Sequence, residues 1–352
     1  MLSCAAILGA TEARPVAACG RWPTIFVLGA QKAGTTTLST TLARASTVVK
    51  LASSSCCSQA MQTNNVTDDL MCNRFASGHG WPKETHFWSW CLNLVRQSVY
   101  RSRMLEQTIW HLQQCSAYPE LFSREGSLVA EMTPEYISEP MLPMALAALY
   151  PRKLQRSARF IVVLREPVAR LFSEFKHFAR NGWTDYSTFE AWAGNQLSHY
   201  RGHSSPVEAA DLVESQRAYR DLARGFYALA LQRWRAHWPR RQMLVLNFHE
   251  LFSKGGEQAA RVFLAQFIGF NGLLAPFVHA NSDSSSSSQR LGCNTSERLR
   301  QVYAPHNVAL HAMLAVDESP IGDAPGVEPF FGAFSPAPDC ESWGAPTAPT
   351  LG

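Results

Sequence analysis

The stretch TIFVLGAQKAGTTTLSTTLA, from Thr24 to Ala43, decides the fold of this chain. It opens with a continuous apolar run, Thr24 to Ala30, which is rich in β-branched residues and typical of a strand buried on both faces of a parallel sheet. A glycine-rich turn follows directly, and from Thr35 onward Leu38 and Leu42 recur at helical spacing. The order strand, loop, helix is the opening of a βαβ unit.

Two later segments repeat this pattern. RFIVVLR (Arg159 to Arg165) predicts a second buried strand, and the helix expected after it begins at Pro167 and closes at Asn181-Gly182. MLVLNF (Met243 to Phe248) predicts a third strand, which follows a helix expected from about Arg217 to Trp238. Such alternation of strands and helices predicts an α/β fold with a mostly parallel sheet.

We expect one main domain, because 352 residues with 46% hydrophobic composition can bury one large core. An irregular insertion is predicted from about 45 to 80, and a serine-rich loop at 281–288. A helix is expected near Glu257 to Ile268, and a last helix is expected to be interrupted at Pro305. The expected boundaries give an N-terminal segment at 1–22, the domain at 23–317 and a tail rich in Pro, Gly and Ala at 318–352.

Charge and cysteine content disfavour several classes of protein. A net charge of +4 falls short of the dense Lys/Arg footprint of a nucleic-acid binder, although it suits anionic ligands. The nine cysteines, including adjacent Cys56 and Cys57, lack the C-x-x-C spacing of a zinc site, so we predict no metal. No stretch reaches the roughly 18 apolar residues that span a bilayer, and MLSCAAILGA makes a poor signal peptide, so we expect no membrane span in this chain.

The loop after the first strand has the features of a phosphate site. Unpartnered N–H groups and the dipole at the start of a helix attract an anion, and Lys32 adds a positive charge between Gly29 and Gly34. Two alternatives are a turn that merely caps the helix and an ATP-binding P-loop. The latter pattern, G-x-x-x-x-G-K-[ST], places its lysine directly after the second glycine, where this chain has Thr35. This displaced lysine argues against a Mg-nucleotide ligand.

The end of the second strand predicts another anion site. Arg165 ends the strand, and helical spacing puts Ser173 on the polar side of the next helix together with Arg170 and His177. One arginine and one hydroxyl can converge on a second phosphate. The alternative is that Arg165 pairs with Glu166 or Glu174 at the surface, with Ser173 merely solvated. A kinase would instead want an acid here to hold Mg²⁺.

Between these two motifs, WPKETHFWSW contains a candidate general base. Its charged residues Lys83, Glu84 and His86 lie among aromatic residues that can raise the pKa of a carboxylate towards working pH and can stack on a sugar face. Glu84 is therefore a candidate base. The alternative is an ordinary Lys-Glu pair at the surface, beside a hydrophobic anchor.

Together these motifs resemble those of the sulfotransferases that use 3′-phosphoadenosine 5′-phosphosulfate (PAPS). KAGTT (Lys32 to Thr36) resembles the family's K-x-G-T-T loop, and REPVARLFS (Arg165 to Ser173) its R-[DE]-P-x-x-R-x-x-S signature. KETHFW (Lys83 to Trp88) is similar to a segment of the heparan sulfate and glycosaminoglycan group. Further similarity lies in EMTPEYI from Glu131, RGFYALALQRW from Arg224 and VYAPHNVAL from Val302. The resemblance implies a P-loop-type three-layer fold, with a mostly parallel central sheet flanked by helices.

The resemblance also implies a role for each site residue, with PAPS as cofactor and no metal. Glu84 would be the catalytic base, Lys83 would lie near the sulfonate, and His86 is a reserve candidate for the base. Lys32 would contact the oxygen that bridges phosphate and sulfate. The expected cofactor-binding residues are Lys32, Ala33, Gly34, Thr35, Thr36 and Thr37 for the 5′-phosphosulfate, Arg165 and Ser173 for the 3′-phosphate, and Arg290 in the late cofactor loop.

These roles predict transfer of a sulfonate group to a hydroxyl or amine of an acceptor, which we expect to be a carbohydrate. Met132 replaces a lysine that is usual in the heparan-type enzymes, so the acceptor's identity does not follow from the resemblance. The alternatives are a P-loop nucleotide kinase or hydrolase, and a non-catalytic relative that binds a glycan or nucleotide. The family and two N-glycosylation triplets, at Asn65 and Asn294, favour the Golgi lumen or secretory pathway and leave the cytoplasm open.

Overall fold

The computed structural model describes residues 22–45, 49–51, 88, 128–200, 219–253, 256–277 and 291–315. In this part of the chain five strands form one sheet in the order β2-β3-β1-β4-β5, and all four pairings between neighbours are parallel. The strands are β1 (Ile25–Gly29), β2 (Val49–Leu51), β3 (Leu128–Glu131), β4 (Arg159–Leu164) and β5 (Met243–Asn247). The expected α/β fold with a parallel sheet is confirmed.

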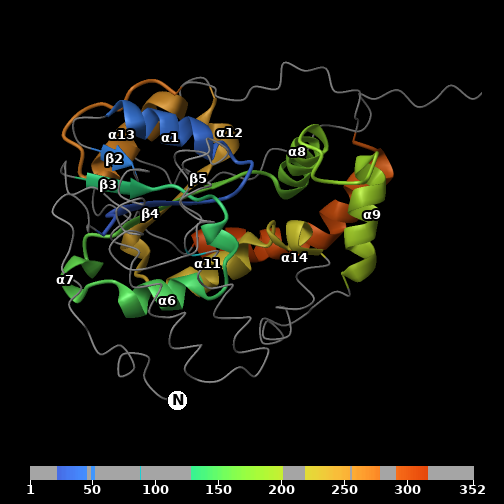
Figure 1. Cartoon of the computed structure of the whole chain (residues 1–352), viewed down its shortest axis with the longest axis horizontal. Coiled ribbons are helices and arrows are strands. Elements are labelled where there is room, and N and C mark those ends of the chain that lie inside the picture. Colours follow the sequence, from blue (N-terminus) through green and yellow to red (C-terminus); the bar gives the residue numbers. More distant parts are fainter. Residues whose placement is uncertain are drawn as a thin grey trace, which may run out of the picture.

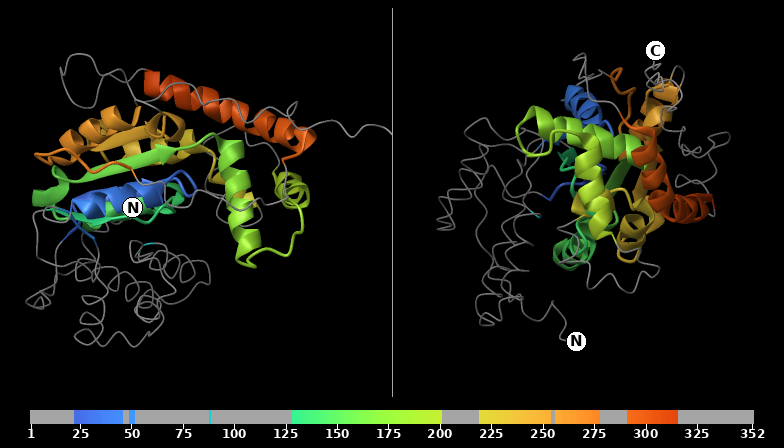
Figure 2. Two further views of the ribbon diagram at one scale, coloured as in Figure 1. Left: turned by 90° about the horizontal axis from the view of Figure 1, so that it is seen from above. Right: turned by 90° about the vertical axis from the view of Figure 1, so that its right-hand side faces the viewer.

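Helices cover both faces of the sheet and give three layers (Figure 1). One face carries α1 (Thr35–Arg44), α12 (Phe248–Leu251) and α13 (Gly256–Ile268). The other face carries α6 (Leu142–Leu149), α11 (Tyr227–Arg235) and the long α14 (Cys293–Ala315). Two more helices, α8 (Pro167–Arg180) and α9 (Phe189–His199), lie beyond the end of the sheet (Figures 1 and 2).

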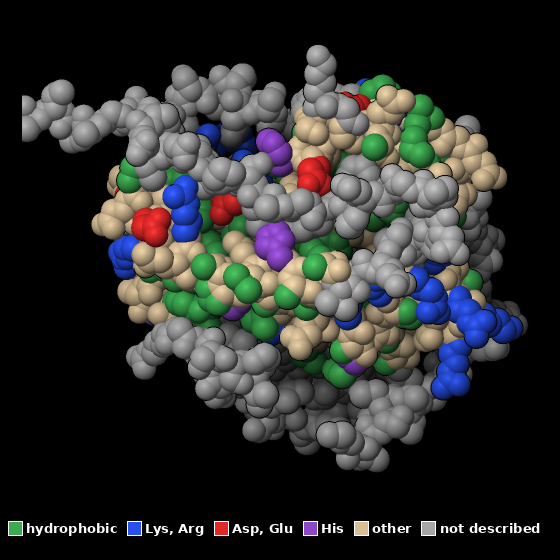
Figure 3. Space-filling model, turned by 180° about the vertical axis from the view of Figure 1, so that it is seen from behind, with side chains coloured by type: hydrophobic (Ala, Val, Ile, Leu, Met, Phe, Trp, Pro, Cys, Tyr) green, Lys and Arg blue, Asp and Glu red, His purple; other side chains and the backbone are tan. Residues whose placement is uncertain are grey.

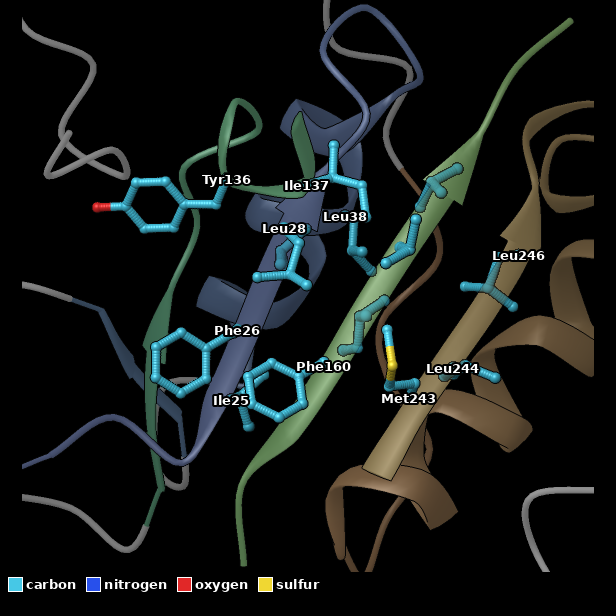
Figure 4. Packing of buried hydrophobic residues seen from close by; sticks show 14 of the residues in the cluster. Ile25, Phe26, Leu28, Leu38, Tyr136, Ile137, Phe160, Met243, Leu244 and Leu246 are labelled. Carbon is cyan, nitrogen blue, oxygen red and sulfur yellow. The ribbon is translucent and has the colours of Figure 1, made fainter. Parts of the chain in front are cut away.

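The main hydrophobic core lies between the sheet and these layers. All five residues of β1 are buried, as are five of the six in β4, because parallel strands covered on both faces have no solvent side. Phe26 of β1 stacks on Phe160 of β4 with ring centroids 5.2 Å apart (Figure 4). Phe160 in turn contacts Trp234 and Trp238, both of which are buried.

A second, smaller core holds α8 and α9 against the C-terminal helix. Leu171 and Phe175 of α8 are fully buried there, together with Phe189 of α9 and Tyr303 of α14. This cluster fixes the helix that follows β4, and therefore fixes the residues between β4 and α8.

The helix expected from Arg217 to Trp238 is broken in the middle, which corrects that prediction. Residues 219–223 are helical, residues 224–226 are not, and α11 begins only at Tyr227. Gly225 lies against the ring of Tyr303, where a Cβ would come within 2.6 Å of a ring carbon. Close packing against α14, which the spacing of apolar residues cannot reveal, therefore accompanies the break.

Two other expectations also need correction. The last helix is not interrupted at Pro305, because α14 runs through it from Cys293 to Ala315. Pro305 and Gln301 are both exposed, so water can satisfy the carbonyl that lacks its helical donor. The range expected to be irregular from about 45 contains β2, which at three residues is too short to show a period. Residues 1–21, 281–288 and 316–352 lie outside the described part.

Within the described residues, no helix combines the length and the apolar character needed to cross a bilayer. The same residues contain no group of three or more His, Cys, Asp or Glu side chains placed to hold a metal ion.

The close approach of Gly225 to α14 generates a test of stability. Gly225→Ala should lower the free energy of unfolding by about 1–3 kcal/mol, because the new methyl group overpacks against the buried ring of Tyr303. Gly194→Ala is the matched control, since nothing lies within 4 Å of its Cβ and alanine favours helix α9 by up to about 1 kcal/mol. Urea denaturation measures both, and equal stability of the Gly225→Ala variant and the parent would contradict this packing.

Candidate active site

Two glycines and a lysine from the end of β1 to the start of α1 have positive φ angles. Gly29, Lys32 and Gly34 have φ values of 140°, 66° and 83°. Gly34 is the N-cap of α1, and no side chain of the described residues caps this helix. The N–H groups of a first helical turn have no partner within the helix and carry partial positive charge. The start of α1 beside Lys32 therefore has the form of an anion site.

The glycines of this loop are also required by packing. A Cβ on Gly34 would come within 2.7 Å of the Phe252 ring, and one on Gly29 would come within 2.4 Å of the Pro134 carbonyl oxygen. Glycine at both positions lets the backbone approach an anion closely. The structure adds a second reason, because these backbone atoms lie directly against α12 and the segment after β3.

Arg165 lies beside this loop, although 133 residues separate it from Lys32. Its Nη1 donates a hydrogen bond of 3.2 Å to the Lys32 carbonyl oxygen. The guanidinium lies 4.8 Å from the centroid of the Phe248 ring, and the Tyr227 hydroxyl donates to the Arg165 carbonyl at 2.9 Å. Since β1 and β4 are neighbouring parallel strands, the residues that follow them meet at one edge of the sheet.

Glu166 caps the helix that carries Ser173. Its carboxylate accepts hydrogen bonds from the N–H groups of Val168, at 3.1 Å, and Ala169, at 2.7 Å. Burial raises the pKa of Glu166 above its usual value, against the opposing effect of these two hydrogen bonds. Ser173 is half-buried on α8, eight residues after Arg165. The carboxylate of Glu166, next to Arg165, therefore acts as the N-cap of α8.

Arg170 does not share the polar side of α8 with Ser173 and His177, and this prediction was wrong. Its side chain is fully buried and pairs with Glu174, one helical turn on, at 2.8 Å. It also donates to the backbone carbonyl of Asp221. Residues 219–224 cover this part of α8, so a position that helical spacing assigns to the surface lies inside the protein. The alternative of a surface pair between Arg165 and Glu174 is excluded for the same reason.

Arg224 joins four segments of the chain around this site. It donates hydrogen bonds to Glu174 at 2.9 Å and to the side chain of Gln31, in the loop before α1, at 2.7 Å. It also forms ion pairs of 3.5 Å with Glu135 and Asp221. Burial alone would lower the pKa of Arg224, but the neighbouring acids outweigh it and raise the pKa. Sequence reasoning missed this residue, because its partners lie up to 193 residues away.

The segment with the candidate base is described only at Trp88. This side chain is fully buried, and its backbone N–H donates to the Tyr136 hydroxyl at 3.2 Å. Tyr136 begins the short 3-10 helix η3 (Tyr136–Ser138), which follows β3 at the same edge of the sheet as the loop before α1. Four predicted site residues lie outside the described part of the chain: Lys83, Glu84, His86 and Arg290.

Comparison with known proteins identifies the family. The profile of the "Sulfotransferase family" matches residues 23–265. This chain belongs to the sulfotransferase family, as its motifs predicted.

Two curated relatives carry heparan sulfate in their names. The chain is 24% identical over 224 residues to human heparan sulfate glucosamine 3-O-sulfotransferase 3B1, which covers 57% of this chain and 52% of the relative. It is 26% identical over 162 residues to mouse bifunctional heparan sulfate N-deacetylase/N-sulfotransferase 2, covering 46% of this chain and 16% of the relative. The predicted resemblance to the heparan sulfate group is confirmed, although the chain spans about half the length of these relatives or less.

A solved sulfotransferase from Alicyclobacillus acidocaldarius shares the fold. Its TM-score is 0.50 with 18% sequence identity, over 84% of this chain and 97% of that chain. At this identity the similarity concerns the fold alone, and it confirms the predicted P-loop-type α/β arrangement.

The buried charge cluster generates a second test of stability. Glu174→Gln should lower the free energy of unfolding by about 3–5 kcal/mol, because it leaves Arg170 and Arg224 buried without their shared carboxylate. Glu297→Gln, whose parent side chain is 59% exposed on α14, should change stability by less than about 0.5 kcal/mol. Chemical denaturation measures both. If the Glu174 variant unfolds like the control, the cluster does not hold α8 in place.

Proposed function

We propose that this chain transfers the sulfonate group of PAPS to a hydroxyl or amine of a carbohydrate acceptor of glycosaminoglycan type. One observation carries the proposal: the hydrogen bond between Arg165 and the Lys32 carbonyl, which brings two candidate phosphate sites to one edge of the sheet. Membership of the sulfotransferase family supports PAPS as the donor. The names of two relatives support a heparan-like acceptor.

The described residues fit a nucleotide with a phosphate at each end. In this proposal the start of α1, with Lys32 and the hydroxyls of Thr35 to Thr37, holds the 5′-phosphosulfate. Arg165 and Ser173 hold the 3′-phosphate, and Arg290 is a further cofactor-binding cation. Two cations and the positive end of the α1 dipole oppose the negative charge of the two ends. No residue in this proposal requires a metal ion.

The chemistry needs a base and charge neutralisation. Bound PAPS supplies an activated sulfonate. Glu84 removes the proton of the acceptor as its oxygen or nitrogen bonds to sulfur and the bond between sulfur and the phosphate oxygen breaks. Lys32 balances the charge that moves onto that oxygen, and Lys83 balances the sulfonate oxygens. His86 is the alternative base. Positioning and electrostatics then supply most of the rate enhancement.

We also propose that residues 23–317 form the sulfotransferase domain and that the protein works in the Golgi lumen or elsewhere in the secretory pathway. The two N-glycosylation triplets support this compartment, and Asn294 is exposed in the first turn of α14.

Cofactor binding tests the proposed phosphate sites. Arg165→Ala should weaken binding of 3′-phosphoadenosine 5′-phosphate about 10- to 100-fold, because a charge-assisted hydrogen bond contributes about 1.5–3 kcal/mol. Arg44→Ala is the control, since this exposed arginine lies at the opposite end of α1 and should leave affinity unchanged. Isothermal titration calorimetry measures both, and equal affinities for the two variants would remove Arg165 from the site.

Turnover tests the proposed base. With sulfur-35-labelled PAPS and a panel of glycans, Glu84→Gln should lose about 10²- to 10⁴-fold in rate while its affinity for 3′-phosphoadenosine 5′-phosphate is unchanged. An unchanged rate would remove Glu84 as the base. Absence of label transfer by the parent protein to any acceptor would contradict the catalytic proposal. A larger rise in melting temperature with Mg-ATP than with the bisphosphate would favour the kinase alternative.

A further inference from the structure

Two groups of cations that are distant in the sequence meet at one end of the sheet. The short helix α7 (Arg152–Gln155) lies just before β4, and the 3-10 helix η5 (Arg240–Gln242) lies just before β5. These strands are parallel neighbours in which Phe160 pairs with Met243, so the segments that enter them lie side by side. The side chain of Gln242 fixes the contact by donating to the Ala158 carbonyl at 2.8 Å.

This contact gathers six cations into one basic surface. The side chains of Arg152, Lys153, Arg156 and Arg241 are exposed, and those of Arg159 and Arg240 are half-buried. Figure 3, which views the molecule from behind, shows Lys and Arg side chains gathered at the end where α7 lies in Figure 1. The basic surface therefore lies at the amino ends of the strands, opposite the edge that carries Lys32 and Arg165. Its members are Arg152, Lys153, Arg156, Arg159, Arg240 and Arg241.

Not every nearby cation joins this surface. Arg235, five residues before Arg240, donates instead to the Met313 carbonyl of α14 at 3.4 Å. Arg233 is half-buried on α11, and burial lowers its pKa. The basic surface is therefore defined by the folded structure rather than by the density of Lys and Arg in the sequence.

The basic surface brings like charges together, without carboxylate partners for its exposed members in the described part of the chain. Arg152 and Lys153 are neighbouring exposed cations on the single turn of α7, and Arg156 directly follows it. Burial lowers the pKa of Arg159, and the positive charge of Arg241 lowers it further. Among the described residues, no carboxylate forms an ion pair with Arg152, Lys153, Arg156 or Arg241. Such a concentration of one charge raises the local concentration of anionic ligands.

One member of the surface is held in a fixed orientation. Arg159 donates to the carbonyls of Arg156, at 2.9 Å, and Ala158, at 3.1 Å, through one nitrogen, and to the Phe267 carbonyl at 3.2 Å through another. Its guanidinium therefore loses little further freedom when an anion binds.

We propose that the basic surface is a second binding site for a linear glycan that carries sulfate or carboxylate groups. Five of its six cations are arginines, whose planar guanidinium groups match these anions with two parallel hydrogen bonds. A membrane surface would also require exposed apolar side chains. None of the exposed large hydrophobic residues in the described part of the chain lies on α7 or η5.

This inference takes the class of acceptor from the proposed function. It adds that activity depends on the length of the acceptor. The six residues of β4 span about 20 Å between the basic surface and the proposed catalytic edge. A long glycan held at the basic surface has a raised effective concentration at the catalytic edge, whereas a short one contacts only one of the two sites. The surface thus favours polymeric acceptors over short oligosaccharides.

Two variants of the full chain with equal charge loss test the proposal. The surface variant combines Arg152→Ser, Lys153→Ser, Arg156→Ser and Arg241→Ser. The control combines Arg44→Ser, Arg180→Ser, Arg220→Ser and Arg298→Ser, four exposed arginines elsewhere. The surface variant should bind heparin about tenfold more weakly than the control and show a smaller dependence of affinity on salt. Both should bind 3′-phosphoadenosine 5′-phosphate like the parent.

Equal heparin affinity of the two variants would overturn the proposal. So would a loss of binding to phosphatidylserine vesicles by the surface variant with heparin binding retained, because that result identifies a membrane site. Heparin binding is measured without PAPS and needs no turnover. A parent protein that transfers no sulfonate would contradict the proposed function, but the heparin comparison would still test the basic surface. With turnover, the surface variant should lose kcat/KM for long acceptors and keep it for short ones.

Discussion

The contact of the Arg165 guanidinium with the Lys32 carbonyl is the interaction on which the proposed site depends. It exists because β1 and β4 pair in parallel, so that the residues following both strands leave the sheet at the same edge. One of these residues belongs to a loop at a helix start and the other precedes a capped helix, so both cations lie beside helix N-termini. The parallel order of two buried strands thus produces a region suited to an anion with two charged ends.

A buried network of charges holds α8 in position relative to the loop before α1. Glu174 lies between Arg170 and Arg224, and Arg224 also reaches Gln31 in the loop before α1. The helix is interrupted at Gly225, which packs against Tyr303, and this interruption accompanies the entry of Arg224 into the cluster. Buried ion pairs contribute little net stability, but removal of one partner is costly, so the cluster favours one arrangement of α8 relative to the loop. The second core and this cluster together connect the C-terminal helix to the proposed cofactor site.

Strands β1, β4 and β5 were predictable because buried parallel strands are continuous apolar runs, and the turns that follow two of them contain the motif residues. Strand β2 and the continuity of α14 through Pro305 were not predictable. Three residues show no period, and a proline is tolerated inside a helix where the carbonyl four residues before it faces water. Helical spacing also assigned Arg170 to the wrong side, because a periodic pattern cannot show that residues 219–224 cover that part of α8. The basic surface likewise required the register of β4 and β5.

The most direct measurement is a crystal structure of the protein with bound 3′-phosphoadenosine 5′-phosphate. The account predicts one nucleotide that contacts both cation sites: its 5′-phosphate hydrogen-bonded to the loop at Lys32 to Thr37, and its 3′-phosphate within hydrogen-bond distance of Arg165 and Ser173. A nucleotide bound elsewhere, or one that contacts the loop while its 3′-phosphate points away from Arg165 into solvent, would contradict the account.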